Sequence, residues 1–251
     1  MRAWWTLVRR EMGTYFISWT GYVIIGVVVF LLGLCFSLLL EAINGERQEM
    51  PVLELFQSSY YFWLILLLAS PVITMRSFAH EKFTGTFETL MTTPVSDLQV
   101  VLAKFASAMI FYLLTWMPLF GCVLVVRHFS NEPGALDAGT ISSTYLGIAL
   151  LGGLYMSIGC FASSLTRSQI IAAMFSLAMG ITLFLLSFLS RVLAAQSGWV
   201  SKLFAHFSMT EHMGDFSRGV VDLRSLVFYL SLTSLFLFLT LKAVESRRWK
   251  S

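Results

Sequence analysis

Long apolar runs constrain this chain more than any other feature of its sequence. A helix that crosses a lipid bilayer needs about 20 mostly apolar residues. Six stretches come close to that length, at Trp19 to Leu40, Ser58 to Met75, Lys104 to Val126, Ile141 to Ser163, Gln169 to Ser190 and Ser225 to Leu241. The sequence therefore predicts an all-α polytopic membrane protein with six transmembrane helices, in which residues 1–251 form one transmembrane domain.

The composition agrees with a membrane protein and argues against a soluble one. Of the 251 residues, 57% are hydrophobic and 12% are charged, which is about half the charged fraction of an ordinary soluble domain. The net charge is only +3, and the basic residues lie beside the apolar runs rather than in one patch. Their expected partner is membrane lipid with anionic headgroups, and we expect no binding of nucleic acid.

The distribution of basic residues predicts the orientation of the spans. One side of the membrane would carry Arg2, Arg9, Arg10, Arg76, Lys82, Lys104, Arg167, Lys242, Arg247, Arg248 and Lys250. The other side would carry Arg47, Arg127, Arg191, Lys202, Arg218 and Arg224. Because connections rich in lysine and arginine remain in the cytoplasm, both termini are predicted to be cytoplasmic.

Residues 1–18 mix apolar and charged side chains just before the first span. Trp4, Trp5 and Val8 are mixed there with Arg9, Arg10 and Glu11. Such a mixture is typical of a helix that lies in the plane of the membrane interface. A disordered tail is the alternative.

The connection between the second and third spans, residues 76–98, predicts a short amphipathic helix. Its apolar face would contain Phe83, Phe87, Leu90 and Met91, with Lys82 and Glu88 elsewhere on the helix. Pro94 would end this helix, and Ser96 to Gln99 resembles a capping box that begins the next one. The helix could lie on the bilayer or dock into a groove of a soluble partner, and the residue pattern alone leaves both open.

The connection over residues 191–224 carries too many apolar side chains for a hydrated loop. These are Trp199, Leu203, Phe204, Phe207, Met209, Met213, Phe216, Val220 and Val221. We therefore expect a short re-entrant or interfacial helix on the outer side, since backbone inside a bilayer must be helical or covered by protein. A flexible hydrophilic loop is the alternative.

The sequence shows no set of catalytic, cofactor-binding or metal-binding residues. It has no phosphate-binding loop of the Gly-x-x-x-x-Gly-Lys-Ser/Thr type. The three cysteines, Cys35, Cys122 and Cys160, and the small residues Ser157, Gly159 and Ser163 are interpreted as packing residues. We place no ionisable residue in the middle of a span, which argues against an ion-coupled transporter and for an energy source outside the membrane.

Several segments resemble one family of membrane proteins, the ABC-2 type permeases. The resemblance rests on EKFTGTFETL at 81–90, PVS at 94–96 and VLAKF at 101–105. RREMGTYF at 9–16, FSRGVVDLR at 216–224 and ESRRW at 245–249 resemble the gliding-motility and nitrous-oxide-reductase-maturation branches. The chain departs from the pattern at Ser18 to Gly21, where relatives tend to have Ser-Pro before the first span.

The resemblance implies an export permease of the bacterial inner membrane. It would dimerise, as a homodimer or heterodimer, and sit on two cytoplasmic ATPase subunits that bind ATP and magnesium, with a possible extracytoplasmic auxiliary subunit. Residues 1–18 would form the connecting helix. The coupling helix that docks on the ATPase would use Glu81, Phe83, Gly85, Thr86, Phe87, Glu88, Leu90, Met91 and Pro94, and the outer re-entrant segment would use Phe216, Arg218, Gly219, Asp222 and Arg224.

Two other classes of protein compete with an export permease. A non-transporting ABC-type subunit would use the same helix bundle to transmit mechanical force to extracytoplasmic partners, and the sequence does not separate it from an exporter. An intramembrane enzyme would need polar catalytic residues within the spans, and the sequence offers no such set.

Overall fold

A computed structural model of the chain describes residues 2–45, 56–57, 59–87, 95–129, 138–193 and 206–248. The elements in chain order are α1 (Arg2–Ile17), α2 (Trp19–Gly45), α4 (Tyr60–Thr74), α5 (Ala79–Thr84), α7 (Asp97–Thr115), α8 (Met117–Phe129), α9 (Ala138–Leu165), α10 (Gln169–Leu193), α12 (Met209–Ser217) and α13 (Leu223–Arg248). Throughout these described ranges the regular structure is helical, without strands. The all-α prediction is confirmed.

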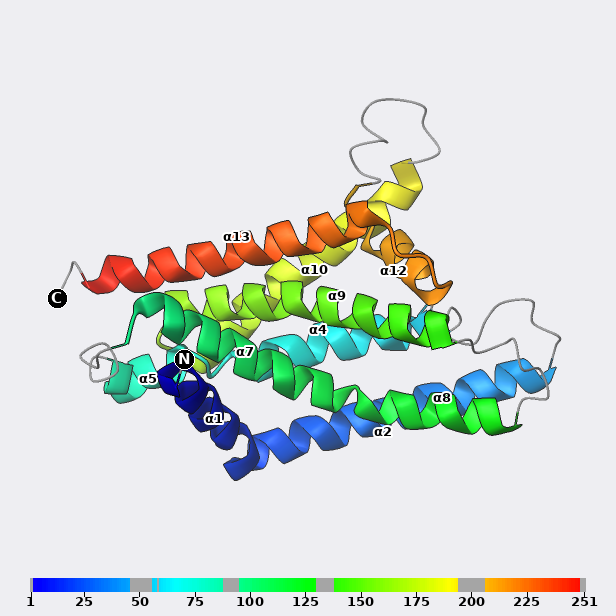
Figure 1. The fold of residues 1–251 in the computed structure, drawn as a ribbon, viewed down its shortest axis with the longest axis horizontal. Helices are drawn as coiled ribbons and strands as arrows, with labels where there is room; N and C mark the ends of the chain where they lie inside the picture. The colour runs from blue at the N-terminus through cyan, green and yellow to red at the C-terminus, as the bar shows by residue number, and fades with distance from the viewer. Residues whose placement is uncertain are drawn as a thin grey trace.

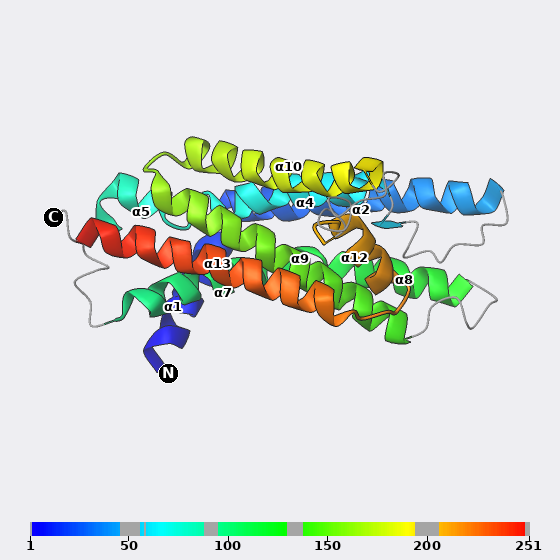
Figure 2. The ribbon, with the colours of Figure 1, turned by 90° about the horizontal axis from the view of Figure 1, so that it is seen from above.

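The long helices run side by side along one axis (Figure 1). Six segments are long and apolar enough to cross a membrane, namely Trp19–Glu41, Tyr60–Thr84, Asp97–Val125, Ala138–Leu165, Gln169–Leu189 and Leu223–Ser246. The six predicted spans are therefore confirmed. In both views, α1 begins and α13 ends toward the end of the bundle that carries α5, whereas α12 lies toward the opposite end (Figures 1 and 2). We call these the α5 end and the α12 end.

The third span consists of two helices, α7 and α8, that meet at Trp116. Pro118 lies two residues beyond Trp116, and a proline within a helix removes one backbone hydrogen bond and clashes with the preceding turn. The Trp116 N–H instead donates to the Leu113 carbonyl at 3.2 Å, which tightens the turn. The kink follows from the proline, although the length of the apolar run had indicated one helix.

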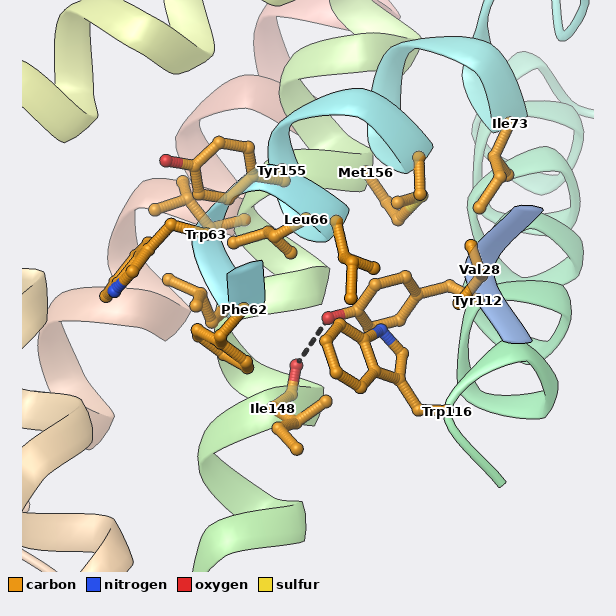
Figure 3. Close-up of a cluster of buried hydrophobic side chains, with 14 of the residues drawn as sticks. Val28, Phe62, Trp63, Leu66, Ile73, Tyr112, Trp116, Ile148, Tyr155 and Met156 are labelled. Atoms are coloured by element: carbon orange, nitrogen blue, oxygen red, sulfur yellow. Dashed lines mark hydrogen bonds between the residues drawn. The ribbon is translucent and has the colours of Figure 1, made fainter. Parts of the chain in front are cut away.

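The core surrounds α9, whose side chains are buried over most of its length. Aromatic residues from α4 and α7, including Phe62, Trp63 and Tyr112, pack in one cluster with Ile148 and Tyr155 of α9 (Figure 3). The Tyr112 hydroxyl donates a hydrogen bond to the Ile148 carbonyl at 3.3 Å. In contrast, few side chains in the candidate spans of α2, α10 and α13 are fully buried.

Two glycines let neighbouring helices approach α9 closely. A Cβ atom at Gly152 would lie 2.0 Å from the ring of Tyr112 on α7, and one at Gly159 would lie 1.9 Å from Oγ1 of Thr74 on α4. Both distances are far shorter than any real contact. The interpretation of Gly159 as a close-packing residue is confirmed.

Helix α1 runs across the direction of the long helices and joins α2 at a sharp elbow (Figures 1 and 2). A Cβ atom at Gly21 would lie 2.0 Å from the Tyr15 carbonyl oxygen, so this elbow requires glycine. The Tyr15 ring stacks on Phe111 of α7 with ring centroids 4.7 Å apart, and its hydroxyl donates to the Ile73 carbonyl at 3.2 Å. The N-terminal segment is thus a packed helix rather than a disordered tail, and its place at a membrane interface stays a prediction.

Candidate functional site

Ser163, near the end of α9, forms hydrogen bonds with the residues at the start of α5. The Ser163 hydroxyl accepts hydrogen bonds from the backbone N–H groups of Phe78 and Ala79, both at 3.0 Å. It also donates to the Met75 carbonyl at 3.2 Å. The first N–H groups of a helix have no partner within it, so Ser163 supplies the acceptor and fixes where α5 begins.

Helix α5 ends after six residues, because Gly85 adopts a left-handed conformation with φ of 76°. This break separates Phe83 from Phe87. Phe83 is 75% exposed, whereas Phe87 is buried in a cluster that includes Phe78 and Val101. The prediction that Phe83 and Phe87 share one continuous apolar face is wrong, because the helical spacing on which it rests does not continue through Gly85.

Lys82 lies on the buried side of the same turn. Its ammonium donates to the Ser164 carbonyl and lies 5.1 Å from the centre of the Phe87 ring. With Lys82 and Phe87 turned inward, the exposed surface of the turn consists of Phe83, Thr84, Gly85 and Thr86. Glu88, Leu90, Met91 and Pro94 lie outside the described residues.

A buried ion cluster joins α5 to two other helices. The ammonium of Lys104, on α7, lies 3.1 Å from a carboxylate oxygen of Glu11 on α1 and 2.9 Å from one of Glu81 on α5. The Lys104 side chain is only 2% exposed, and its ammonium lies 5.4 Å from the centre of the Phe78 ring. One cation thus holds carboxylates from two different elements.

The second carboxylate oxygen of Glu81 is buried and has no hydrogen-bond partner among the described residues. The cluster also contains two carboxylates and one ammonium, so the acidic groups outnumber the cation. Removing one partner from a buried ion pair typically costs about 3–5 kcal/mol, because a charge remains in surroundings of low polarity. Separating α5 from α1 and α7 would therefore be strongly unfavourable.

A second polar network links the same end of the bundle to α2 and α10. Arg76, which follows α4, donates to the hydroxyls of Ser18 and Thr20 at 2.7 and 2.8 Å. It also donates to the side-chain carbonyl of Gln169 at 3.2 Å, and the amide nitrogen of Gln169 lies 2.9 Å from Nδ1 of His80 on α5. Both networks converge on α5. This short helix is bonded directly to α7, α9 and α10, and it is linked to α1 through Lys104 and to α2 through Gln169 and Arg76.

The α12 end holds the residues that the sequence analysis assigns to a re-entrant segment. Phe216 is fully buried, and its carbonyl accepts a hydrogen bond from Ser143 of α9 at 2.6 Å. Gly219 has φ of 86°, and the Asp222 carboxylate accepts from the Arg224 N–H at 2.9 Å to cap α13. Arg218 and Arg224 are exposed. Phe216 therefore packs against α9, Gly219 allows the turn that follows α12, and Asp222 caps α13.

The predicted helix in the outer connection is present as α12, a helix of nine residues. Residues 194–205, with Trp199, Leu203 and Phe204, lie outside the described residues. On α12, burial lowers the pKa of His212 below its ordinary value of 6.5, so its imidazole is neutral at neutral pH. Whether α12 enters the membrane stays a prediction.

Residues 15–186, more than half of the chain, match the family model for ABC-2 family transporter proteins. The chain belongs to the ABC-2 transporter family. No curated protein matches it. This ABC-2 permease is thus a multi-pass membrane subunit of an ABC transporter, a type of subunit that is generally not catalytic itself, and the family implies an ABC ATPase as its partner. The match supports the ABC-2 family as a whole and does not support the gliding-motility or nitrous-oxide-reductase-maturation branch in particular.

Sequence reasoning located α5 in this ABC-2 permease but missed the ion cluster beneath it. The resemblance assigns Glu81 to the surface that docks on the ATPase, yet its side chain is 12% exposed and pairs with Lys104. The apolar run predicts that Lys104 lies at the end of its span, whereas α7 begins at Asp97 and puts Lys104 about two turns inside the helix. The signal in the sequence was Lys104 itself, because a lysine buried within an apolar run requires a compensating charge, but the sequence does not show which carboxylates supply it.

Proposed function

We propose that this ABC-2 permease receives the motion of a separate ATPase subunit at α5 and passes it to α1 and α7 through Lys104. The observation that supports this proposal is the buried cluster of Glu11, Glu81 and Lys104, in which one ammonium contacts carboxylates from α1 and α5 at 3.1 and 2.9 Å. The exposed Phe83 and the turn from Thr84 to Thr86 would bind the ATPase.

The proposed path depends on the cost of separating buried charges. If the ATPase shifts α5, Glu81 must either leave Lys104 or move α7 with it, and Glu11 ties α1 to the same ammonium. Because breaking a buried pair is costly, the joint movement is favoured. Helices held in two alternative arrangements by such contacts can turn a small local shift into a rearrangement of the whole bundle.

The wider assignment rests on the family resemblance. ATP and magnesium would bind to two copies of the ATPase, and two permease protomers would alternate between two arrangements to export a substrate from the cytoplasm. The α5 end would face the cytoplasm of a bacterium, with the bundle in the inner membrane. The gliding-motility or nitrous-oxide-reductase-maturation branch stays a prediction of the sequence motifs.

A neutral cluster tests transmission separately from docking. The triple variant Glu11→Gln, Glu81→Gln and Lys104→Met removes all three charges together, so no unpaired charge is left buried. The tagged triple variant should still co-purify its ATPase, but the permease should no longer change the rate of ATP hydrolysis. Lys242→Met with Glu245→Gln is the matched control, because it removes a surface ion pair on α13 whose atoms lie 2.7 Å apart.

Two outcomes would contradict this proposal. A triple variant whose ATP hydrolysis responds like that of the wild type would show that the ion cluster does not transmit motion. If no ATPase co-purifies with the wild-type chain, and none is captured by cross-linking through the variant Thr86→Cys, then α5 does not dock on one. Melting temperatures of all variants, measured in detergent, would identify a variant that fails to fold.

A further inference from the structure

Helix α1 has two faces of different chemistry. The inward face carries Val8, which is buried, Glu11, which pairs with Lys104, and Tyr15, which stacks on Phe111. The outward face carries Trp5, Arg9, Arg10 and Ile17, all exposed, and Phe16 lies at its edge, 38% exposed with its ring 5.8 Å from that of Phe111. Packing against the bundle explains the first face and the contact of Phe16, and leaves Trp5, Arg9, Arg10 and Ile17 unexplained.

The outward face combines aromatic and cationic groups at helical spacing. Trp5, Arg9 and Phe16 fall within a narrow stripe, since residues four and eleven positions apart lie on one side of a helix. Arg10 and Ile17 form a second stripe about 100° further around the helix. Trp5 is 60% exposed and Ile17 is 87% exposed. In the described part of the chain, neither arginine has an ion-pair partner.

The position of this face relative to the spans indicates what covers it. Helix α1 leads at Ser18 directly into α2, the first span, whose first residue Trp19 is 87% exposed. Tryptophan rings concentrate where the apolar core of a membrane meets its headgroups. Arginines held at that depth contact the phosphate groups of anionic lipids, which attract basic residues.

We infer that the outward face of α1, formed by Trp5, Arg9, Arg10, Phe16 and Ile17, is a binding surface for anionic phospholipid headgroups. The rings and Ile17 insert beside the acyl chains, and the two guanidinium groups contact phosphate oxygens. An acidic protein surface could pair with the two arginines, but it would cover Trp5, Phe16 and Ile17 less well than lipid acyl chains do.

The lipid contact would also bear on coupling, a consequence that rests on the proposed function. Arg10 and Glu11 are neighbours on one helix, and Glu11 contacts Lys104 at 3.1 Å. Headgroups that hold the outward face of α1 would therefore fix the position from which Glu11 reaches Lys104.

The experiment measures lipid preference on the full-length permease alone. Wild-type chain, the variant Arg9→Gln with Arg10→Gln, and the control Arg167→Gln with Arg224→Gln are reconstituted with equal amounts of phosphatidylcholine and phosphatidylglycerol. Lipids that remain bound in detergent are then counted by native mass spectrometry. The control removes the same charge from two exposed arginines elsewhere on the chain.

The wild type and the control should retain phosphatidylglycerol over phosphatidylcholine. The Arg9 and Arg10 variant should lose this preference by about thirty-fold, from roughly 1 kcal/mol for each basic residue near an anionic surface. An unchanged preference in that variant, or an equal loss in the control, overturns the inference. Displacement of the lipid by free glycerol phosphate also overturns it. Because the measurement needs no ATPase, its result is independent of the docking proposal.

Discussion

At the scale of single residues, the close approach of helices depends on glycines, which lack a Cβ atom. Gly159 has no Cβ, and Thr74 of α4 occupies the space that such an atom would take, with its Oγ1 at 1.9 Å from the ideal Cβ position. The Thr74 hydroxyl donates to the Ser70 carbonyl at 2.8 Å and is thereby held in place. The contact between α4 and α9 has no room for a methyl group.

Gly159→Ala should therefore destabilise the fold by about 1–3 kcal/mol, the usual range for overpacking a tight core. Gly33→Ala on α2 is the matched control, because no atom lies within 4 Å of its ideal Cβ position, and it should be neutral or stabilise by up to about 1 kcal/mol. Melting temperatures of both variants in detergent test this difference. Equal melting temperatures would show that α4 and α9 can move apart at little cost.

At the scale of elements, α5 is too short to be stable alone. Isolated helices shorter than about 12 residues are marginal in water, and α5 has six residues. Its conformation depends on Ser163 at its start, Gly85 at its end, and the contacts of Glu81 and Lys82 with other helices. As a result, Phe83 is presented at a fixed position on an otherwise polar turn.

If Phe83 is the anchor for the ATPase, Phe83→Asp should weaken ATPase binding by more than about tenfold, since central aromatic residues often contribute 2 kcal/mol or more to an interface. Phe83→Leu keeps an apolar group and should retain most of the binding. Titration of the purified ATPase against both variants gives the two affinities. If Phe83→Asp binds like the wild type, the anchor lies elsewhere on the α5 end.

At the scale of the whole molecule, α5 and α12 lie toward opposite ends of one bundle (Figure 1). The bundle has six candidate spans in the described residues, and an even number of spans places both ends of a chain on one side of a membrane. The excess of basic residues before the first span and after the last predicts that this side is the cytoplasm.

Cysteine labelling tests this orientation. In a background with Cys122→Ser, where Cys35 and Cys160 are buried, single cysteines are placed at the exposed positions of Thr86 on the α5 turn and Val220 beside α12. A membrane-impermeant maleimide added to intact cells should label Val220→Cys alone, and Thr86→Cys should react only after the cells are opened. The reverse pattern would invert the predicted topology.

The sequence by itself determined the features that depend on local chemistry. Apolar runs of membrane length fix the six spans, because no other solvent accepts them. Ser96 begins α7 as predicted, with its hydroxyl accepting from the Gln99 N–H at 3.3 Å. The helical nature of residues 2–17 and the existence of α12 also follow from composition and spacing.

Only the tertiary structure decided which side chains meet. Glu11, Glu81 and Lys104 are separated by 70 and 23 positions in the sequence, and no local pattern relates them. The structure turns Glu81 toward Lys104 and separates exposed Phe83 from buried Phe87 at Gly85. The physical reason is that spacing reports the faces of a continuous helix, whereas burying a charge requires partners that come together only when the helices pack.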